Sequence, residues 1–233
     1  MICPPNTAAL AALHPATLAR RWVCALAAVL VAGCAAGPTS HVYTLTDPAP
    51  QATATARPAA PGQPPLFVEF APIAVPERLA RPQMLVRKPG LPSAQVQLLE
   101  FHRWSSSFEY ELRDALASGV AARLGAIGST SGVRAAGQPA WRVTVQVRQF
   151  DLVEGERADA AFSWTLRPPG AAEGLRTMSC QWSASEPAGP GVEALAQAAQ
   201  RLTARAADAM ARDLIAASTG GATDCARAPA EDK

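Results

Sequence analysis

The chain has 233 residues, with 21 Lys and Arg against 19 Asp and Glu, so its formal net charge is only +2 at pH 7 with His neutral. The basic residues form no block or stripe, which argues against a nucleic-acid partner. Two of them, Arg20 and Arg21, belong to a segment that we expect to be removed. Its loss leaves 19 basic and 19 acidic residues in 200, enough for one domain with a substantial core.

Residues 1–33 have the order that is typical of a secretory signal peptide, which is basic, then apolar, then small. The apolar run Trp22–Val31 is too short to span a membrane, which needs about 20 apolar residues. The sequence Val31-Ala32-Gly33-Cys34 resembles the bacterial lipobox. The resemblance implies cleavage after Gly33 and acylation of Cys34 with diacylglycerol and a further chain such as palmitate, which together anchor stably. The alternative is an ordinary signal peptide with a cysteine nearby by chance.

The residue after Cys34 bears on the destination of the lipoprotein. Ala35 stands where an acidic residue would be the usual signal for retention at the inner membrane. We therefore expect an anchor at the periplasmic face of the outer membrane. The three cysteines that remain after cleavage then lie in a compartment that permits disulfides.

Residues 34–65 are predicted to form a lipidated N-terminus and a Pro-rich segment. From Asp47 to Pro65 the chain is rich in Pro, Ala, Thr and Gln without apolar periodicity, which is typical of a solvated tether. Val42–Leu45 is a short apolar stretch that is also compatible with a first strand. In that case the Pro-rich segment is an excursion from the domain and not a free tether. Residues 219–233 are predicted to be a disordered tail.

The domain itself is predicted over residues 66–218. Its helices are expected at 106–124, with a capping box from Ser106 to Glu109 and a C-cap at Gly125, and from about Gly191 to Met210. Strands are expected at 66–70, 83–88, 94–99, 141–148, 160–166 and 178–182, the last three as a meander. This order predicts a single α/β (α+β) domain, a mixed but mainly antiparallel sheet with two amphipathic helices packed on it.

No residue pattern predicts catalysis, a metal site or a cofactor. Gly128–Gly132 superficially resembles a nucleophile elbow, but Thr130 is its central residue and no strand clearly precedes it. His41 and His102 are the imidazoles of the mature chain, and Glu154 and Glu156 lie in a turn. We expect a protein that is not an enzyme, although a hydrolase centred on His102 stays open.

Cys180 and Cys225 allow two interpretations. They can form a disulfide. Alternatively Cys180 is a buried free thiol, because it alternates in phase with Met178 and Trp182 on the predicted strand.

Four residues are candidates for a partner surface: Arg81, Gln83, Arg103 and Trp104. They stand beside prolines or aromatic residues, in Pro76–Gln83 and Glu100–Trp104. One interpretation is a strand-edge loop in which an arginine packs on Trp104. The other is a binding surface, since Arg and Trp are favoured at interfaces.

The order of these motifs resembles that of the auxiliary lipoprotein component of ABC-type intermembrane transport systems, the Pqi-type lipoprotein family. The similar features span most of residues 34–216. They are Tyr43-Thr44-Leu45 after the lipid cysteine, Val75-Pro76-x-x-Leu79-x-Arg81-Pro82-Gln83 with Arg87 after it, and Arg103-Trp104 before the helix. One departure is Ser105-Ser106-Ser107, where the family often has an acidic residue and Pro.

The resemblance implies a non-enzymatic subunit of a phospholipid transport machine. It would sit at the outer membrane and dock a periplasmic MCE-domain protein, with Arg81, Gln83, Arg103 and Trp104 as the residues to test. The alternative is an envelope lipoprotein that binds and regulates a peptidoglycan synthase. The sequence leaves open whether the chain forms a homo-oligomer.

Overall fold

The computed structural model describes residues 38–46, 67–90, 92, 94–125, 127–129, 140–171, 177–221 and 225–227. The predicted signal peptide, Gly33, Cys34 and Thr130 lie outside the described residues. The chain divides into two units, Met1–Thr39 and Ser40–Lys233. The description below concerns the second unit, which starts at Ser40 and not at residue 66.

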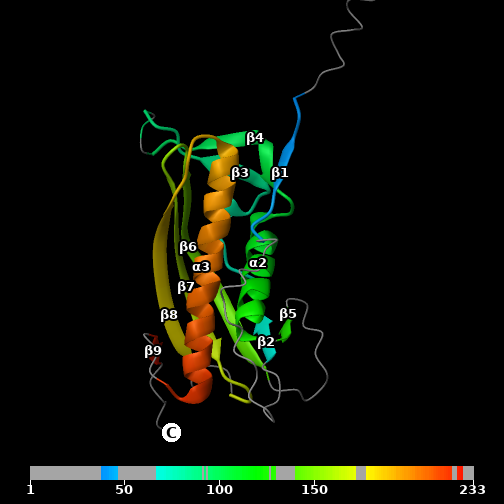
Figure 1. The fold of residues 1–233 in the computed structure, drawn as a ribbon, viewed down its shortest axis with the longest axis vertical. Helices are drawn as coiled ribbons and strands as arrows, with labels where there is room; N and C mark the ends of the chain where they lie inside the picture. The colour runs from blue at the N-terminus through cyan, green and yellow to red at the C-terminus, as the bar shows by residue number, and fades with distance from the viewer. Residues whose placement is uncertain are drawn as a thin grey trace, which may run out of the picture. The chain divides into compact units, whose positions relative to one another are not determined.

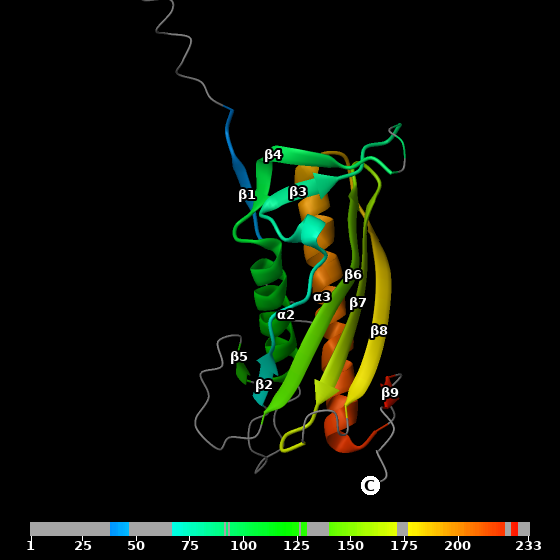
Figure 2. The same ribbon diagram turned by 180° about the vertical axis from the view of Figure 1, so that it is seen from behind.

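The larger of two sheets has six strands in the order β5-β2-β6-β7-β8-β9 (Figures 1 and 2). β2 is parallel to both of its neighbours, whereas β6 to β9 are antiparallel. The strands are β2 (Phe67–Phe70), β5 (Ile127–Ser129), β6 (Trp141–Val153), β7 (Arg157–Arg167), β8 (Met178–Pro187) and β9 (Ala226–Arg227). The sheet is therefore mixed but mainly antiparallel.

Strand β6 changes its buried phase half-way along. Val143, Val145 and Val147 are buried and alternate with exposed polar residues. The register with β7 shifts between Val147 and Gln149, so the next buried side chains are Phe150 and Leu152. An extra residue in one strand re-aims all side chains that follow it. The bulge thereby directs Phe150 and Leu152 toward the smaller sheet.

Two helices lie side by side against one face of the larger sheet, α2 (Phe108–Leu124) and α3 (Val192–Thr219) (Figure 1). The buried face of α3 is largely alanine, which lets α2 approach closely. A Cβ added at Gly119 of α2 would lie 2.9 Å from the Cβ of Ala207. Both helices end at a glycine in the left-handed conformation, as Gly125 was predicted to do.

The smaller sheet has three strands in the order β1-β4-β3, with β1 parallel and β3 antiparallel to the central β4. Its elements are β1 (His41–Tyr43), the 3-10 helix η1 (Glu77–Leu79), β3 (Gln83–Val86) and β4 (Gln97–Trp104). A parallel bridge between Arg87 and Val153 joins it to the end of β6. In Figures 1 and 2 this sheet lies beyond the first turn of α2.

The predicted fold class is confirmed, because the unit is α+β with two helices on a mixed sheet. β1 belongs to the same unit as the later strands, so residues 47–66 connect two strands of one fold. This agrees with the excursion that the sequence left open for the Pro-rich segment.

Three local predictions need correction. The N-cap of α2 is Ser107 and makes no side-chain capping bond, so the capping box at Ser106 is wrong. The strand expected at 94–99 runs instead from Gln97 to Trp104. Residues 225–227, expected to be disordered, contribute β9 and a disulfide cysteine, because Cys225 is bonded to Cys180 of β8.

Candidate docking site

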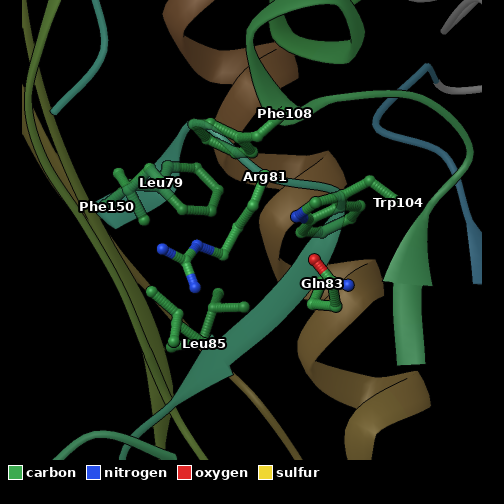
Figure 3. A pocket seen from close by; sticks show the side chains of 8 residues that line it. Leu79, Arg81, Gln83, Leu85, Trp104, Phe108 and Phe150 are labelled. Atoms are coloured by element: carbon green, nitrogen blue, oxygen red, sulfur yellow. The ribbon is translucent and has the colours of Figure 1, made fainter. Parts of the chain in front are cut away.

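Three of the four candidate partner residues line one pocket. It lies where η1, β3, the end of β4, the start of α2 and the second half of β6 meet, and we call it the Arg81 pocket. Its walls are Leu79, Arg81, Gln83, Leu85, Trp104, Phe108, Phe150 and Leu152. In Figure 3 the Arg81 side chain extends toward Leu85 and Phe150, and the Gln83 side chain lies beside Trp104.

The aromatic walls of the pocket are fixed by packing in the core. Trp104 is 3% exposed, and its ring lies 6.1 Å from that of Phe108 between centroids. Phe108 in turn contacts Phe150 with a ring distance of 4.6 Å. Tilted aromatic pairs at such distances are favourable. Trp104 therefore shapes the pocket from within, and the exposed side chain of Arg81 supplies its charge.

The pocket is small. The space between its walls is about 260 Å³ with the part open to solvent included, but only about 10 Å³ of it admits the centre of a water molecule. The latter is room for about one water molecule, and pockets that enclose small molecules measure roughly 300–1,000 Å³. The pocket suits the tip of an inserted side chain and not a lipid acyl chain.

Arg103, the fourth candidate, lies beside the pocket and not in its wall. It pairs with Gln83 of β3 on one side and with Val42 of β1 on the other. Directly opposed residues in a sheet point to the same face. Val42, Arg103 and Gln83 therefore form a row across the three strands, which we call the Arg103 row. Val42 is 52% exposed, and Arg103 is exposed as well.

A carboxylate that the sequence analysis missed holds β1 in place. Glu111 of α2 is 8% exposed and accepts hydrogen bonds from the Thr44 hydroxyl (3.0 Å) and the Leu45 backbone N–H (3.1 Å). The hydroxyls of Ser105 and Ser106 donate to its other oxygen. Thr44 and Leu45 belong to the family motif, and their place on Glu111 gives the motif a structural role. The sequence did contain a sign of this role, because Glu111 is an acidic residue on the apolar face of the predicted helix, between Phe108 and Leu112.

The two histidines of the described part of the chain meet at the junction of β1 and β4. The rings of His41 and His102 stack with centroids 4.9 Å apart, and the Tyr43 hydroxyl lies 3.0 Å from Nδ1 of His102. Burial lowers the pKa of His102, the charge of His41 lowers it further, and Glu154 acts in the opposite direction. Burial and the charge of Glu193 raise the pKa of Tyr43.

Neither imidazole contacts a serine, threonine or cysteine side chain among the residues that the structure describes. The histidines therefore serve a strand junction there and form no nucleophile–base pair. The two carboxylates of the β6–β7 turn are likewise in ion pairs, Glu154 with Lys88 and Glu156 with Arg157.

Cys180 and Cys225 form a disulfide that links β8 to the segment after α3. Asp213 of α3 places a carboxylate oxygen within 4.8 Å of both sulfur atoms. This is the spacing of a metal-ligand cluster, but sulfur atoms in a disulfide are not thiolates and do not ligate a metal. The disulfide therefore fixes the segment before β9 covalently to β8.

No helix in the described ranges is long and apolar enough to cross a membrane.

Two solved structures share the fold of this chain. One is described as an uncharacterized protein and is 16% identical, with a TM-score of 0.57 over 76% of this chain and 99% of that one. The other, a Xanthomonas campestris protein assigned to the DUF330 family, is 14% identical, with a TM-score of 0.56 over 78% of this chain and 98% of that one. At these identities the likeness shows the fold alone. No curated protein matches the chain.

A family model matches residues 43–211, which is more than half of the chain. The matched region begins at Tyr43 of β1 and includes the Arg81 pocket, Gln83 and Arg103 of the Arg103 row, all of α2, and α3 as far as Ala211. The resemblance drawn from the sequence motifs is confirmed, and this chain belongs to the family described as the ABC-type transport auxiliary lipoprotein component.

Proposed function

We propose that this protein is the outer-membrane-anchored docking subunit of an MCE/ABC-type phospholipid transport system. Lipid on Cys34 would hold it at the periplasmic face, and the Arg81 pocket with the Arg103 row would bind a periplasmic MCE-domain protein. Membership in a lipoprotein family implies a membrane-anchored place in the envelope. The family's description as a transport component supports a non-enzymatic role.

One observation carries the proposal. Among the described residues, the side chains of Arg81 and Gln83 have no hydrogen-bond or ion-pair partner, although they stand against a rigid aromatic wall. Unpaired arginine beside buried aromatic residues is the composition of protein-binding hot spots. The pocket is also too small to enclose a transported acyl chain, so its geometry favours docking over lipid carriage.

The test is co-purification from native envelopes. The full-length acylated protein would be crosslinked in cells, purified and analysed by mass spectrometry, beside Arg81→Glu and Arg103→Glu variants. Arg148→Glu is a matched control, because Arg148 is exposed on β6, is not a wall residue of the pocket and has no ion pair within the described residues. We expect an MCE-domain protein with the wild type and the control, and at least a severalfold loss with the other two variants.

Two results would contradict the proposal. One is recovery of no MCE-domain protein under conditions that retain weak complexes. The other is recovery of a peptidoglycan synthase, which would establish the alternative function.

The anchor is tested separately with Cys34→Ser. We expect the protein to leave the outer-membrane fraction while purified protein still binds its partner, because the lipid serves placement. If binding itself is lost, the anchor is part of the contact.

A further inference from the structure

The positive charge of Arg81 at the pocket is not neutralised by an ion pair within the described residues. Within the described residues, neither Arg81 nor Arg103 takes part in an ion pair, and no wall residue of the pocket is acidic. Elsewhere in the unit seven arginines do form ion pairs with Asp or Glu: Arg87, Arg113, Arg123, Arg142, Arg157, Arg201 and Arg205. Arg78, Arg148, Arg167 and Arg212 likewise form no ion pair within the described residues. Arg81 lines the pocket and Arg103 pairs with its wall residue Gln83, so their guanidinium groups are available to an anionic ligand there.

The two cations are arranged along a line and not at one point. Arg81 stands at the pocket, and Arg103 stands one strand further, directly across from Gln83. Directly opposed residues have Cβ atoms about 4.5–5.5 Å apart. Val42 continues the Arg103 row to β1, and its side chain is 52% exposed. A ligand that satisfies both cations must carry more than one negative charge along an extended path.

The walls of the pocket decide which anion fits. Its apolar side chains would exclude water around a carboxylate bound to Arg81, which strengthens a charge-assisted hydrogen bond. A planar guanidinium can hold a carboxylate through two parallel bonds. A phospholipid also carries negative charge, but its acyl chains would need a far larger cavity than the one present.

We propose that the Arg81 pocket and the Arg103 row recognise an acidic, extended segment of a partner protein. One Asp or Glu carboxylate of that segment binds Arg81 with help from the Gln83 amide, a second binds Arg103, and apolar side chains between them contact Val42. The inference rests on the proposed docking function and specifies the chemistry of the contact.

The first experiment identifies the segment. A photo-reactive benzoylphenylalanine replaces Val42 in the full-length protein, and the crosslinked peptide is sequenced after irradiation of intact envelopes. Val42 is suitable because it is exposed and lies in the Arg103 row. We expect the crosslinked peptide to carry at least two Asp or Glu residues close to the crosslinked position. The same probe at Arg148 on the outer face of β6 controls for random capture.

The second experiment tests the charges. The identified segment is synthesised, and its affinity for the full chain is measured at several salt concentrations. Arg81→Gln should weaken binding about tenfold. Arg81→Lys should weaken it less, because lysine keeps the positive charge but cannot form the two parallel hydrogen bonds of a guanidinium. Arg148→Gln should leave the affinity unchanged. Arg81→Glu combined with an Asp or Glu→Arg change in the segment should restore affinity. Arg81 is exposed and unpaired within the described residues, so we expect all these variants to fold, which thermal unfolding would verify.

The outcomes separate the two proposals. An acidic segment from an MCE-domain protein supports both. An acidic segment from another protein supports the recognition chemistry and overturns the proposed function. Capture of an MCE-domain protein through a segment without acidic residues, or a charge exchange that restores nothing, overturns the recognition chemistry alone. Crosslinks to phospholipid only overturn this inference in favour of a membrane-binding surface.

Discussion

The stacked imidazoles of His41 and His102 link the protonation state of single residues to the attachment of β1. Both rings lie on strands whose pairing is parallel and in register, so protonation of both places two positive charges 4.9 Å apart between ring centroids. Burial and the neighbouring His41 already lower the pKa of His102, while Glu154 in the β6–β7 turn opposes them. The folded state therefore favours the neutral imidazole.

This shift predicts that β1 detaches more readily at low pH. The unfolded chain takes up a proton near the ordinary His pKa of 6.5, but folded His102 takes it up only at lower pH. The contribution of neutral His102 to stability is therefore fully present above the ordinary His pKa of 6.5. It is lost as the pH falls below that value toward the lowered pKa of folded His102. We expect hydrogen exchange of the β1 amides, corrected for the intrinsic rate, to accelerate from about pH 7.5 to about pH 5.

The amides of β7 serve as an internal reference, since β7 belongs to the larger sheet and pairs with neither of the strands that carry the histidines. His102→Gln should remove most of the pH dependence. If β1 and β7 respond equally to pH in the wild type, the effect is global and this explanation is wrong.

Single residues also show what the sequence could not reveal. Three of the four candidate partner residues, Arg81, Gln83 and Trp104, line one pocket, and Arg103 pairs with Gln83 beside it, whereas their role in binding stays a prediction. The pocket walls Phe108 and Phe150 were missed as site residues. Phe150 follows a bulge, and the predicted strand ended at Arg148 because strict alternation stops there. The signal was a change of apolar phase from odd to even positions, and its meaning depends on pairing with β7.

Among the elements, the contact of α2 with α3 depends on the absence of one side chain. Gly119 faces Ala207, and even a methyl group there would lie 2.9 Å from the Ala207 Cβ. Arg123 and Asp208 form an ion pair between the same helices. Because both helices are fixed against the sheet, neither can move away freely to accommodate a larger residue.

We therefore predict that Gly119→Val destabilises the protein by about 1–3 kcal/mol, the usual cost of overpacking. Urea denaturation followed by circular dichroism measures it. Ala122→Val, at an exposed position of the same helix, controls for the helix propensity of valine. Gly119→Ala should also be costly, and adding Ala207→Gly should recover most of that loss. Equal effects at positions 119 and 122 would show that the helices separate without strain.

Long, locally periodic elements were the predictable part of the fold. The helices and the meander of β6 to β8 can be read from the spacing of apolar residues within each segment. That spacing is regular because each element buries one of its faces. β1 and β5 have three residues each, and both pair in parallel with strands distant in sequence. Such short strands exist only because a partner provides hydrogen bonds. The helix start was misplaced because Ser106 was assigned to a cap, whereas its hydroxyl donates to Glu111.

For the molecule as a whole, the disulfide connects the end of α3 back to the sheet. Cys180 and Cys225 are 45 residues apart in sequence, and the loop that they close contains all of α3. The bond limits the conformations of the unfolded chain, and it also holds β9 against β8. Spacing alone could not distinguish this bond from a free buried thiol, because the contact depends on how α3 returns to the sheet.

Replacing both cysteines with alanine should lower the free energy of unfolding by about 2–4 kcal/mol. Chemical denaturation with and without dithiothreitol measures the change, and reductant should affect the wild type but not the double variant. Binding to the partner should persist, since the disulfide and the Arg81 pocket lie on different elements. The prediction would be contradicted if the free energy of unfolding of the wild type stayed the same after the disulfide had been fully reduced, as verified by thiol titration.

The attachment of β1 has a mechanical consequence. The chain enters the folded unit through this strand, so a pull exerted along the N-terminal segment reaches the domain first at His41–Tyr43. Immediately after the strand, the Thr44 hydroxyl and the Leu45 backbone N–H donate hydrogen bonds to Glu111, and the Leu45 side chain is buried. The side-chain amide of Gln200 in α3 donates to the Thr44 carbonyl. The pulling force is thus divided between the pairing of β1 with β4, Glu111 in the first turn of α2 and Gln200 of α3. Because the Arg103 row crosses the same strand, a pull on the segment before β1 acts directly on the surface where the partner would bind.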